Sequence, residues 1–95
     1  MKGFIMKEIT MSLSGIYIPD EFHGRLGEYL PLPEYYGANL DALHDVLTSL
    51  PGEWQITFTE TAEAEAMMEK YMRKLKKMCE KISEENSKLS IIFID

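Results

Sequence analysis

Three side chains close together in the sequence could act as one chemical group: Asp41, His44 and Asp45. Their spacing of three and four residues places two carboxylates and an imidazole on one face of a helix. Such ligands suit zinc or manganese, but three of them on one helical turn, without a second element, seldom form a closed site. A solvated helix face is the simpler structural interpretation, with Asp41 complementing the positive end of the helix dipole. We expect no metal.

Catalysis is the second chemical use to weigh, because His23 and His44 could transfer protons. No serine, cysteine or glycine-rich signature accompanies either histidine, and acid–base chemistry needs a concave site with paired groups. The one cysteine, Cys79, lies on the apolar side of a helical pattern, so we expect it to be buried rather than reactive. The sequence therefore favours a protein without enzymatic activity or cofactor.

The sequence around the carboxylates predicts the helix that carries them. Asn39 is a good N-cap, so the helix should begin at Asn39 or Leu40. One face is apolar, with Leu40, Leu43, Val46, Leu47 and Leu50 at helical spacing, and Asp41, His44, Asp45 and Thr48 share the opposite face. Pro51-Gly52 should end the helix. In the loop before it, Pro33 should hold Leu32 extended, and Gly37 can take a positive φ.

This loop and helix resemble the barstar family of intracellular inhibitors of barnase-type secreted ribonucleases. The matching residues are Leu32 to Tyr36, Gly37, Asn39 to Leu43, Asp45, Leu47 and Thr48. The N-terminal apolar pattern, His23 and the last strand also align, so the resemblance covers the chain from about Ile9 onward. It implies an α/β, two-layer fold, in which three or four helices pack against a three-stranded parallel sheet.

The resemblance also implies a function, which is 1:1 inhibition of a small basic ribonuclease. An acidic loop and helix, residues 35–49, would block the phosphate-binding cleft of the enzyme. The residues expected to contact the partner are Tyr35, Gly37, Asn39, Asp41, His44, Asp45, Thr48 and Ser49. Tyr36 would point inward, and Asp45 would take the place of a substrate phosphate.

The chain departs from the family at three positions. His44 and Leu50 stand where the family has tryptophans, and Lys81 falls near an acidic residue that the family offers from its last helix. The cognate partner therefore need not be barnase itself. The alternative is an acidic interaction module whose partner is another basic toxin or a regulatory protein, and a small enzyme is a more distant third.

Charge along the chain fits a basic protein partner. The net charge is −6 over 95 residues, and residues 20–60 hold eight acids against Arg25 alone, which leaves −7 in that segment. Such a field repels nucleic acid and steers a cationic protein toward it. Without the motif, simple solubility would be the favoured explanation of the acidic composition. The basic stripe of a later helix, namely Lys70, Arg73, Lys74, Lys77 and Lys81, is interrupted by acids, and we interpret it as a solvated face.

Length and hydropathy predict one domain, residues 1–95, with a small core. No apolar run approaches the roughly 20 residues that span a bilayer. Residues 1–8 carry charge too early for a signal peptide, so we expect the protein to stay in the cytoplasm. We separately expect the free protein to be a monomer.

Three strands and at least three helices are expected around this core, in the order β-α-α-β-α-β with parallel pairing. Besides the helix at Asn39, the expected elements are a strand at Ile9–Leu13, a helix from Pro19, a strand at Trp54–Thr59, one long helix at Ala62–Asn86 and a strand at Leu89–Ile94. The last strand is almost continuously apolar, which predicts burial on both of its faces.

Overall fold

The computed structural model describes residues 6–95 and contains a single sheet. The elements, in chain order, are β1 (Met6–Ser12), α1 (Pro19–Leu26), α2 (Leu40–Thr48), β2 (Glu53–Thr59), α3 (Ala62–Met67), α4 (Glu69–Glu85) and β3 (Leu89–Phe93). Residues 1–5 lie outside the described residues. They belong to the expected domain 1–95 and to the N-terminal segment that was considered as a signal peptide.

The three strands pair in parallel in the order β1-β2-β3. Their register aligns Ile9, Ile56 and Ile91 across the sheet. The parallel three-stranded α/β fold expected from the sequence is therefore confirmed. The first strand begins at Met6, three residues earlier than expected, and ends at Ser12.

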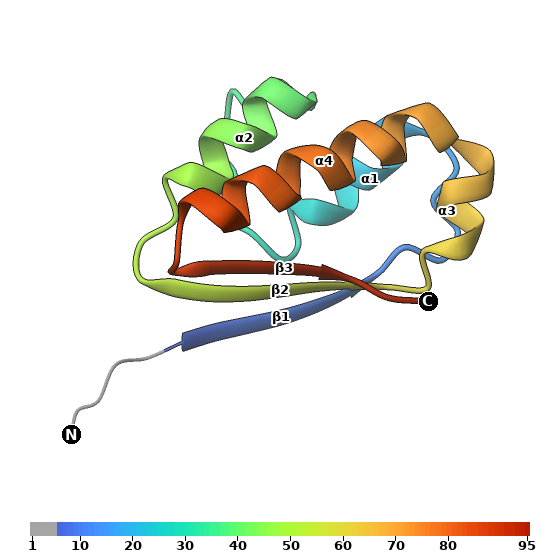
Figure 1. Ribbon diagram of the computed structural model, residues 1–95. Coiled ribbons are helices and arrows are strands. Elements are labelled where there is room, and N and C mark those ends of the chain that lie inside the picture. Colours follow the sequence, from blue (N-terminus) through green and yellow to red (C-terminus); the bar gives the residue numbers. More distant parts are fainter. Residues whose placement is uncertain (1–5) are drawn as a thin grey trace.

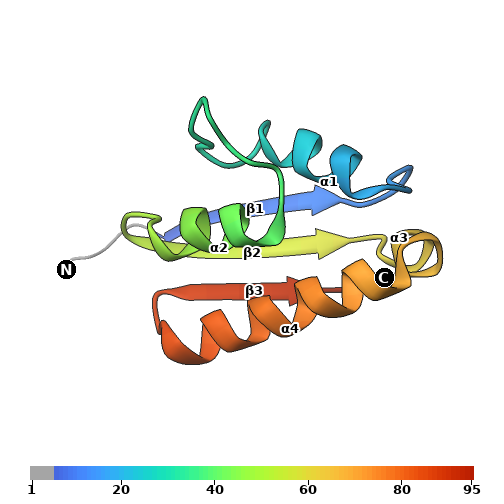
Figure 2. The same cartoon turned by 90° about the horizontal axis from the view of Figure 1, so that it is seen from above.

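All four helices lie on one face of the sheet (Figure 1). Seen from above, α1 runs along β1, α2 lies over β2 and α4 runs along β3 (Figure 2). Side chains of β2 accordingly alternate between buried and half-buried, as its period-two pattern predicted.

The expectation that the last strand is buried on both faces is wrong. In β3 only Leu89 is buried, while Ser90 and Ile92 are exposed on the uncovered face. Two features explain the difference: β3 is an edge strand, and the helices cover only one side of the sheet (Figure 1).

The core is one apolar layer between the sheet and the helices. Its fully buried side chains include Met11, Leu13, Ile16, Phe22, Leu26, Leu43, Ile56, Met72, Leu75 and Cys79. Burial raises the pKa of the Cys79 thiol to about 12, which keeps it protonated and unreactive. The expectation that Cys79 is a packing residue is confirmed.

The expected single helix from Ala62 to Asn86 is two helices, so the element order becomes β-α-α-β-α-α-β. The break lies at Met68, whose backbone is not helical (φ −135°, ψ 57°). No proline or glycine marks this position. Met68 and Ala64 are both buried in the core, and the Met68 N–H donates to the Ala64 carbonyl oxygen at 2.9 Å, so the turn between α3 and α4 faces the core.

The helix expected at Pro19 begins there, and Glu21 organises its first turn. The Glu21 carboxylate accepts from the backbone N–H groups of Tyr17 and Ile18, at 2.9 and 3.3 Å. These bonds satisfy the backbone donors of the N-cap residue Ile18 and of Tyr17 just before it, as in a capping box. Within residues 6–95, no helix is long and apolar enough to span a membrane.

A polar cluster lies at the edge of this mostly apolar core, with His23 buried and its two partners, Tyr36 and Tyr71, half-buried. His23 of α1 is 3% exposed, and its Nδ1 and Nε2 lie 2.6 and 2.5 Å from the hydroxyl oxygens of Tyr36 and Tyr71. Burial lowers the pKa of His23 below its usual 6.5, and the Asp20 carboxylate opposes this shift only partly. The folded protein therefore holds a neutral imidazole, which has one donor and one acceptor for the two hydroxyls.

This cluster predicts that acid destabilises the fold through His23. The unfolded chain takes up a proton near pH 6.5, whereas the folded chain does so only at lower pH. The contribution of neutral His23 to the free energy of unfolding is complete above pH 6.5, and it is lost as the pH falls through the pKa of His23 in the folded protein. We expect His23→Gln, which keeps a donor and an acceptor but cannot titrate, to lose less stability than the wild type between pH 7.5 and 5.5. Urea unfolding at both pH values measures this, and equal losses in the two proteins would contradict it.

Candidate functional site

Helix α2 is held by its cap and by one buried side. The Asn39 side-chain oxygen accepts from the backbone N–H of Ala42 at 2.8 Å, so the expected N-cap is confirmed. Leu43 and Leu47 are buried. The helix ends at Thr48, before the Pro51-Gly52 pair expected to stop it. The cap therefore fixes where the helix begins, and its buried face fixes the rotation of the helix about its axis.

The opposite side of α2 presents the sequence-predicted polar residues to solvent. Those that are exposed are Asp41, His44, Asp45, Thr48 and Ser49. The Asp45 side chain is 88% exposed, and the nearest oxygen of its carboxylate lies 4.0 Å from Nδ1 of His44. The Thr48 hydroxyl donates to the backbone oxygen of His44 at 2.8 Å. The helix thus offers Asp45 as a solvated anion on a rigid element.

The loop before α2 points its two neighbouring tyrosines in opposite directions. Tyr35 is 88% exposed, whereas Tyr36 packs against the core and bonds to His23. The inward orientation of Tyr36 implied by the family resemblance is therefore confirmed. A turn closed by the Tyr36 N–H, which donates to the Pro33 oxygen at 3.1 Å, sets the two directions.

Gly37 does not use the positive φ that a glycine can take, and its neighbour Ala38 has that conformation (φ 51°). A left-handed alanine is strained by its own Cβ. Gly37 serves a different need, which is space: a Cβ there would lie 3.3 Å from Nδ2 of Asn39 and 3.6 Å from Cβ of Ala42. A side chain at position 37 would therefore press on the helix cap.

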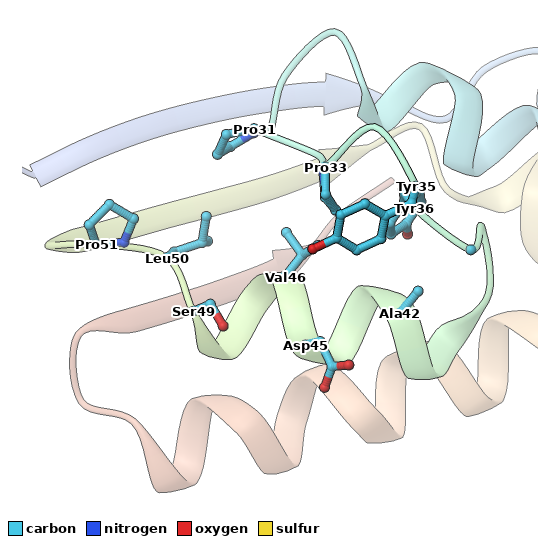
Figure 3. A pocket seen from close by; sticks show the side chains of 11 residues that line it. Pro31, Pro33, Tyr35, Tyr36, Ala42, Asp45, Val46, Ser49, Leu50 and Pro51 are labelled. Carbon is cyan, nitrogen blue, oxygen red and sulfur yellow. The ribbon is translucent and has the colours of Figure 1, made fainter.

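A groove of about 460 Å³ runs between the loop and α2. It is lined by Pro31, Pro33, Tyr35, Tyr36, Gly37, Ala42, Asp45, Val46, Ser49, Leu50 and Pro51. Figure 3 shows the Tyr35 ring lying across the groove and Asp45 at its outer rim. Four predicted site residues, Tyr35, Gly37, Asp45 and Ser49, thus share one surface feature.

The other predicted residues lie beside the groove rather than in it. Asn39, Asp41, His44 and Thr48 occupy the loop end and the outer face of α2. Sequence reasoning missed the apolar wall formed by Pro31, Ala42, Val46 and Pro51. Prolines flanking both ends of the motif are the one signal that could have indicated this wall.

The site is negatively charged, and the guanidinium of Arg25 does not neutralise its carboxylates. That guanidinium is committed to the end of β1, where it donates to the backbone oxygens of Ser12 and Ser14, at 2.8 Å each. Lys81 is exposed on α4. Among residues 6–95, no group of three His, Cys, Asp or Glu side chains could hold a metal ion.

The chain is similar to a known protein family. A family model described as Barstar (barnase inhibitor) matches residues 6–94, almost the whole chain and three residues more at the N-terminal end than the resemblance indicated. No curated protein matches the chain.

The capping bond predicts a measurable contribution to stability. Asn39→Ala should lower the free energy of unfolding by about 1 kcal/mol, because the first turn of α2 loses its acceptor. Asn39→Ser retains an acceptor and should cost much less. Chemical denaturation of the three proteins checks this, and equal losses for alanine and serine would show that the cap is not what holds the helix start.

Proposed function

Because the chain belongs to the barstar family, a family of barnase inhibitors, we propose that it inhibits a small, basic, barnase-type ribonuclease. The complex is 1:1, and residues 35–49 block the phosphate-binding cleft of the enzyme. The family is one of inhibitors and not of catalysts, so inhibition is by occlusion, without chemistry and without a cofactor.

The observation that carries this proposal is the position of Asp45. Its carboxylate is 88% exposed, stands on a capped helix and lies at the rim of a groove. A ribonuclease cleft must hold cationic groups to bind RNA and stabilise its transition state. An anion held at a fixed place on a rigid element meets those cations where a phosphate would lie, and it loses little conformational entropy in doing so.

The remaining site residues take supporting roles in this proposal. Asp41 adds a second carboxylate one turn before Asp45, and Tyr35 packs on the rim of the enzyme's cleft. Asn39, Gly37, Thr48 and Ser49 supply polar and backbone contacts. The acidic segment 20–60 attracts the basic enzyme from a distance, because charge complementarity raises the rate of encounter.

A second candidate function is an acidic interaction module for another basic toxin or a regulatory protein. The observation that favours it is the exposed His44 on α2 and the half-buried Leu50, which follows the end of that helix, at the two positions where the family has tryptophans. Large aromatic side chains are frequent anchors of protein interfaces, so their replacement changes which partner surface fits. The matching experiment is a comparison of barnase with other basic proteins as ligands.

The proposal also covers where the protein is located and the oligomeric state of the unbound protein. We propose a monomer in the cytoplasm, where an inhibitor would protect RNA from a ribonuclease destined for secretion. Neither nucleic acid nor a membrane is a proposed partner, since a segment of charge −7 repels phosphates.

Asp45→Ala should weaken the complex more than any other single change on α2. The expected loss is about 2–5 kcal/mol, because the cations of the partner are left buried and unpaired. The free protein should be as stable as the wild type or slightly more so, since one charge of an acidic surface is removed. Isothermal titration with barnase and urea unfolding of the free protein measure the two effects.

Glu28→Ala is the matched control, because Glu28 is also exposed and acidic but lies outside residues 35–49. It removes the same charge and should change affinity far less. If Asp45→Ala unfolds the protein, Asp45 is structural and its proposed role is wrong.

Association should also depend strongly on salt. At physiological ionic strength the Debye length is about 8 Å, so added salt screens the attraction between the acidic segment and a basic enzyme. We expect the association rate constant to fall roughly tenfold or more between low and high salt, with a smaller change in the dissociation rate constant. Stopped-flow mixing checks this, and an association rate that is independent of salt would exclude steering.

A further inference from the structure

The cluster of His23, Tyr36 and Tyr71 joins three parts of the chain that are distant in sequence. His23 lies on α1, Tyr36 in the loop that precedes α2, and Tyr71 in the first turn of α4. Besides the two hydrogen bonds, the rings are in contact: the His23 centroid lies 5.5 Å from that of Tyr36 and 6.0 Å from that of Tyr71. The loop is thereby connected to two helices through one buried imidazole.

The cluster is also chemically complete. Burial raises the pKa of Tyr36 to about 12 and raises that of Tyr71, so both hydroxyls keep their protons. A neutral imidazole accepts from one hydroxyl and donates to the other, and each hydroxyl can serve in either role. Buried polar networks with every member paired tend to specify one arrangement, because any alternative leaves a polar atom without a partner.

The position of Tyr36 in the loop gives the cluster its significance. Tyr36 directly follows Tyr35, which is 88% exposed and lies across the groove (Figure 3). The same segment contains the strained Ala38 (φ 51°), which needs support from its surroundings to persist. An inward anchor at Tyr36 therefore fixes where Tyr35 stands relative to Asp45.

We propose that His23 and Tyr71 are positioning residues for the partner-binding loop, because they hold Tyr36 and thereby preorganise Tyr35 and the groove. This inference rests on the proposed function as far as binding is concerned. Its effect on the loop exists in the free protein as well. Without the cluster the loop would have to be ordered on binding, and that cost would appear mainly as faster dissociation.

The decisive variant is Tyr71→Phe, which removes one hydroxyl and keeps the ring. Tyr71 lies on α4, outside the proposed contact surface. Tyr17→Phe is the matched control, since it also removes one hydroxyl hydrogen bond, to Glu63 at 3.2 Å. Hydrogen exchange of residues 33–39 in the free proteins should be about three- to tenfold faster in Tyr71→Phe than in the wild type, the effect of losing about one hydrogen bond. It should be unchanged in Tyr17→Phe.

Binding to barnase, used as the probe, supplies the second readout. Dissociation should be about three- to tenfold faster in Tyr71→Phe, with an unaltered salt dependence of association, because no charge has changed. In a Tyr35→Ala background, Tyr71→Phe should change dissociation by less than about twofold, since the side chain whose position depends on the cluster is absent. A merely structural role would give equal effects in both backgrounds.

The two readouts separate failure of this inference from failure of the proposed function. A wild-type protein that does not bind barnase would count against the barnase-type partner, while the exchange of the loop would still decide the role of the cluster. Unchanged exchange of residues 33–39 in Tyr71→Phe, or fully additive effects with Tyr35→Ala, would overturn the inference.

Discussion

Burial of a single apolar layer is the constraint on which the rest of this structure depends. The helices cover one face of a three-stranded sheet, so each element has only one side that must be apolar (Figure 1). In a small domain that layer supplies most of the favourable free energy of folding. Helix α2 buries Leu43 and Leu47 on the side that faces the core, and its opposite side carries the exposed Asp41 and Asp45.

An acidic surface of this kind is compatible with a stable fold because its charges stay in water. The carboxylates of α2 are exposed, so they avoid the desolvation cost of a buried charge, and their mutual repulsion is screened by solvent. The helix start is secured by the Asn39 cap and by space at Gly37. Local backbone chemistry and core packing thus hold an anionic array that the charges themselves do not favour.

The polar cluster around His23 connects this surface to the core. Apolar packing alone is tolerant of small displacements, whereas a buried imidazole that depends on two half-buried hydroxyl groups for its hydrogen bonds is not. Residue 36 belongs to both regions, since its hydroxyl bonds to His23 and its neighbour Tyr35 lies across the groove. The contacts of Tyr36 therefore belong both to the packing of the core and to the loop that lines the groove.

The sequence alone determined the elements whose causes are local. The cap at Asn39, the two-sided pattern of α2 and the alternation in β2 depend on residues a few positions apart, and the structure has each of them. Three features were missed: the break at Met68, the exposure of one face of β3, and the positive φ at Ala38. The groove and the cluster of His23, Tyr36 and Tyr71 arise only when distant segments meet. Only the tertiary structure could decide these features, because a contact between residues 23, 36 and 71 leaves no periodic or capping signal in the sequence around any one of them.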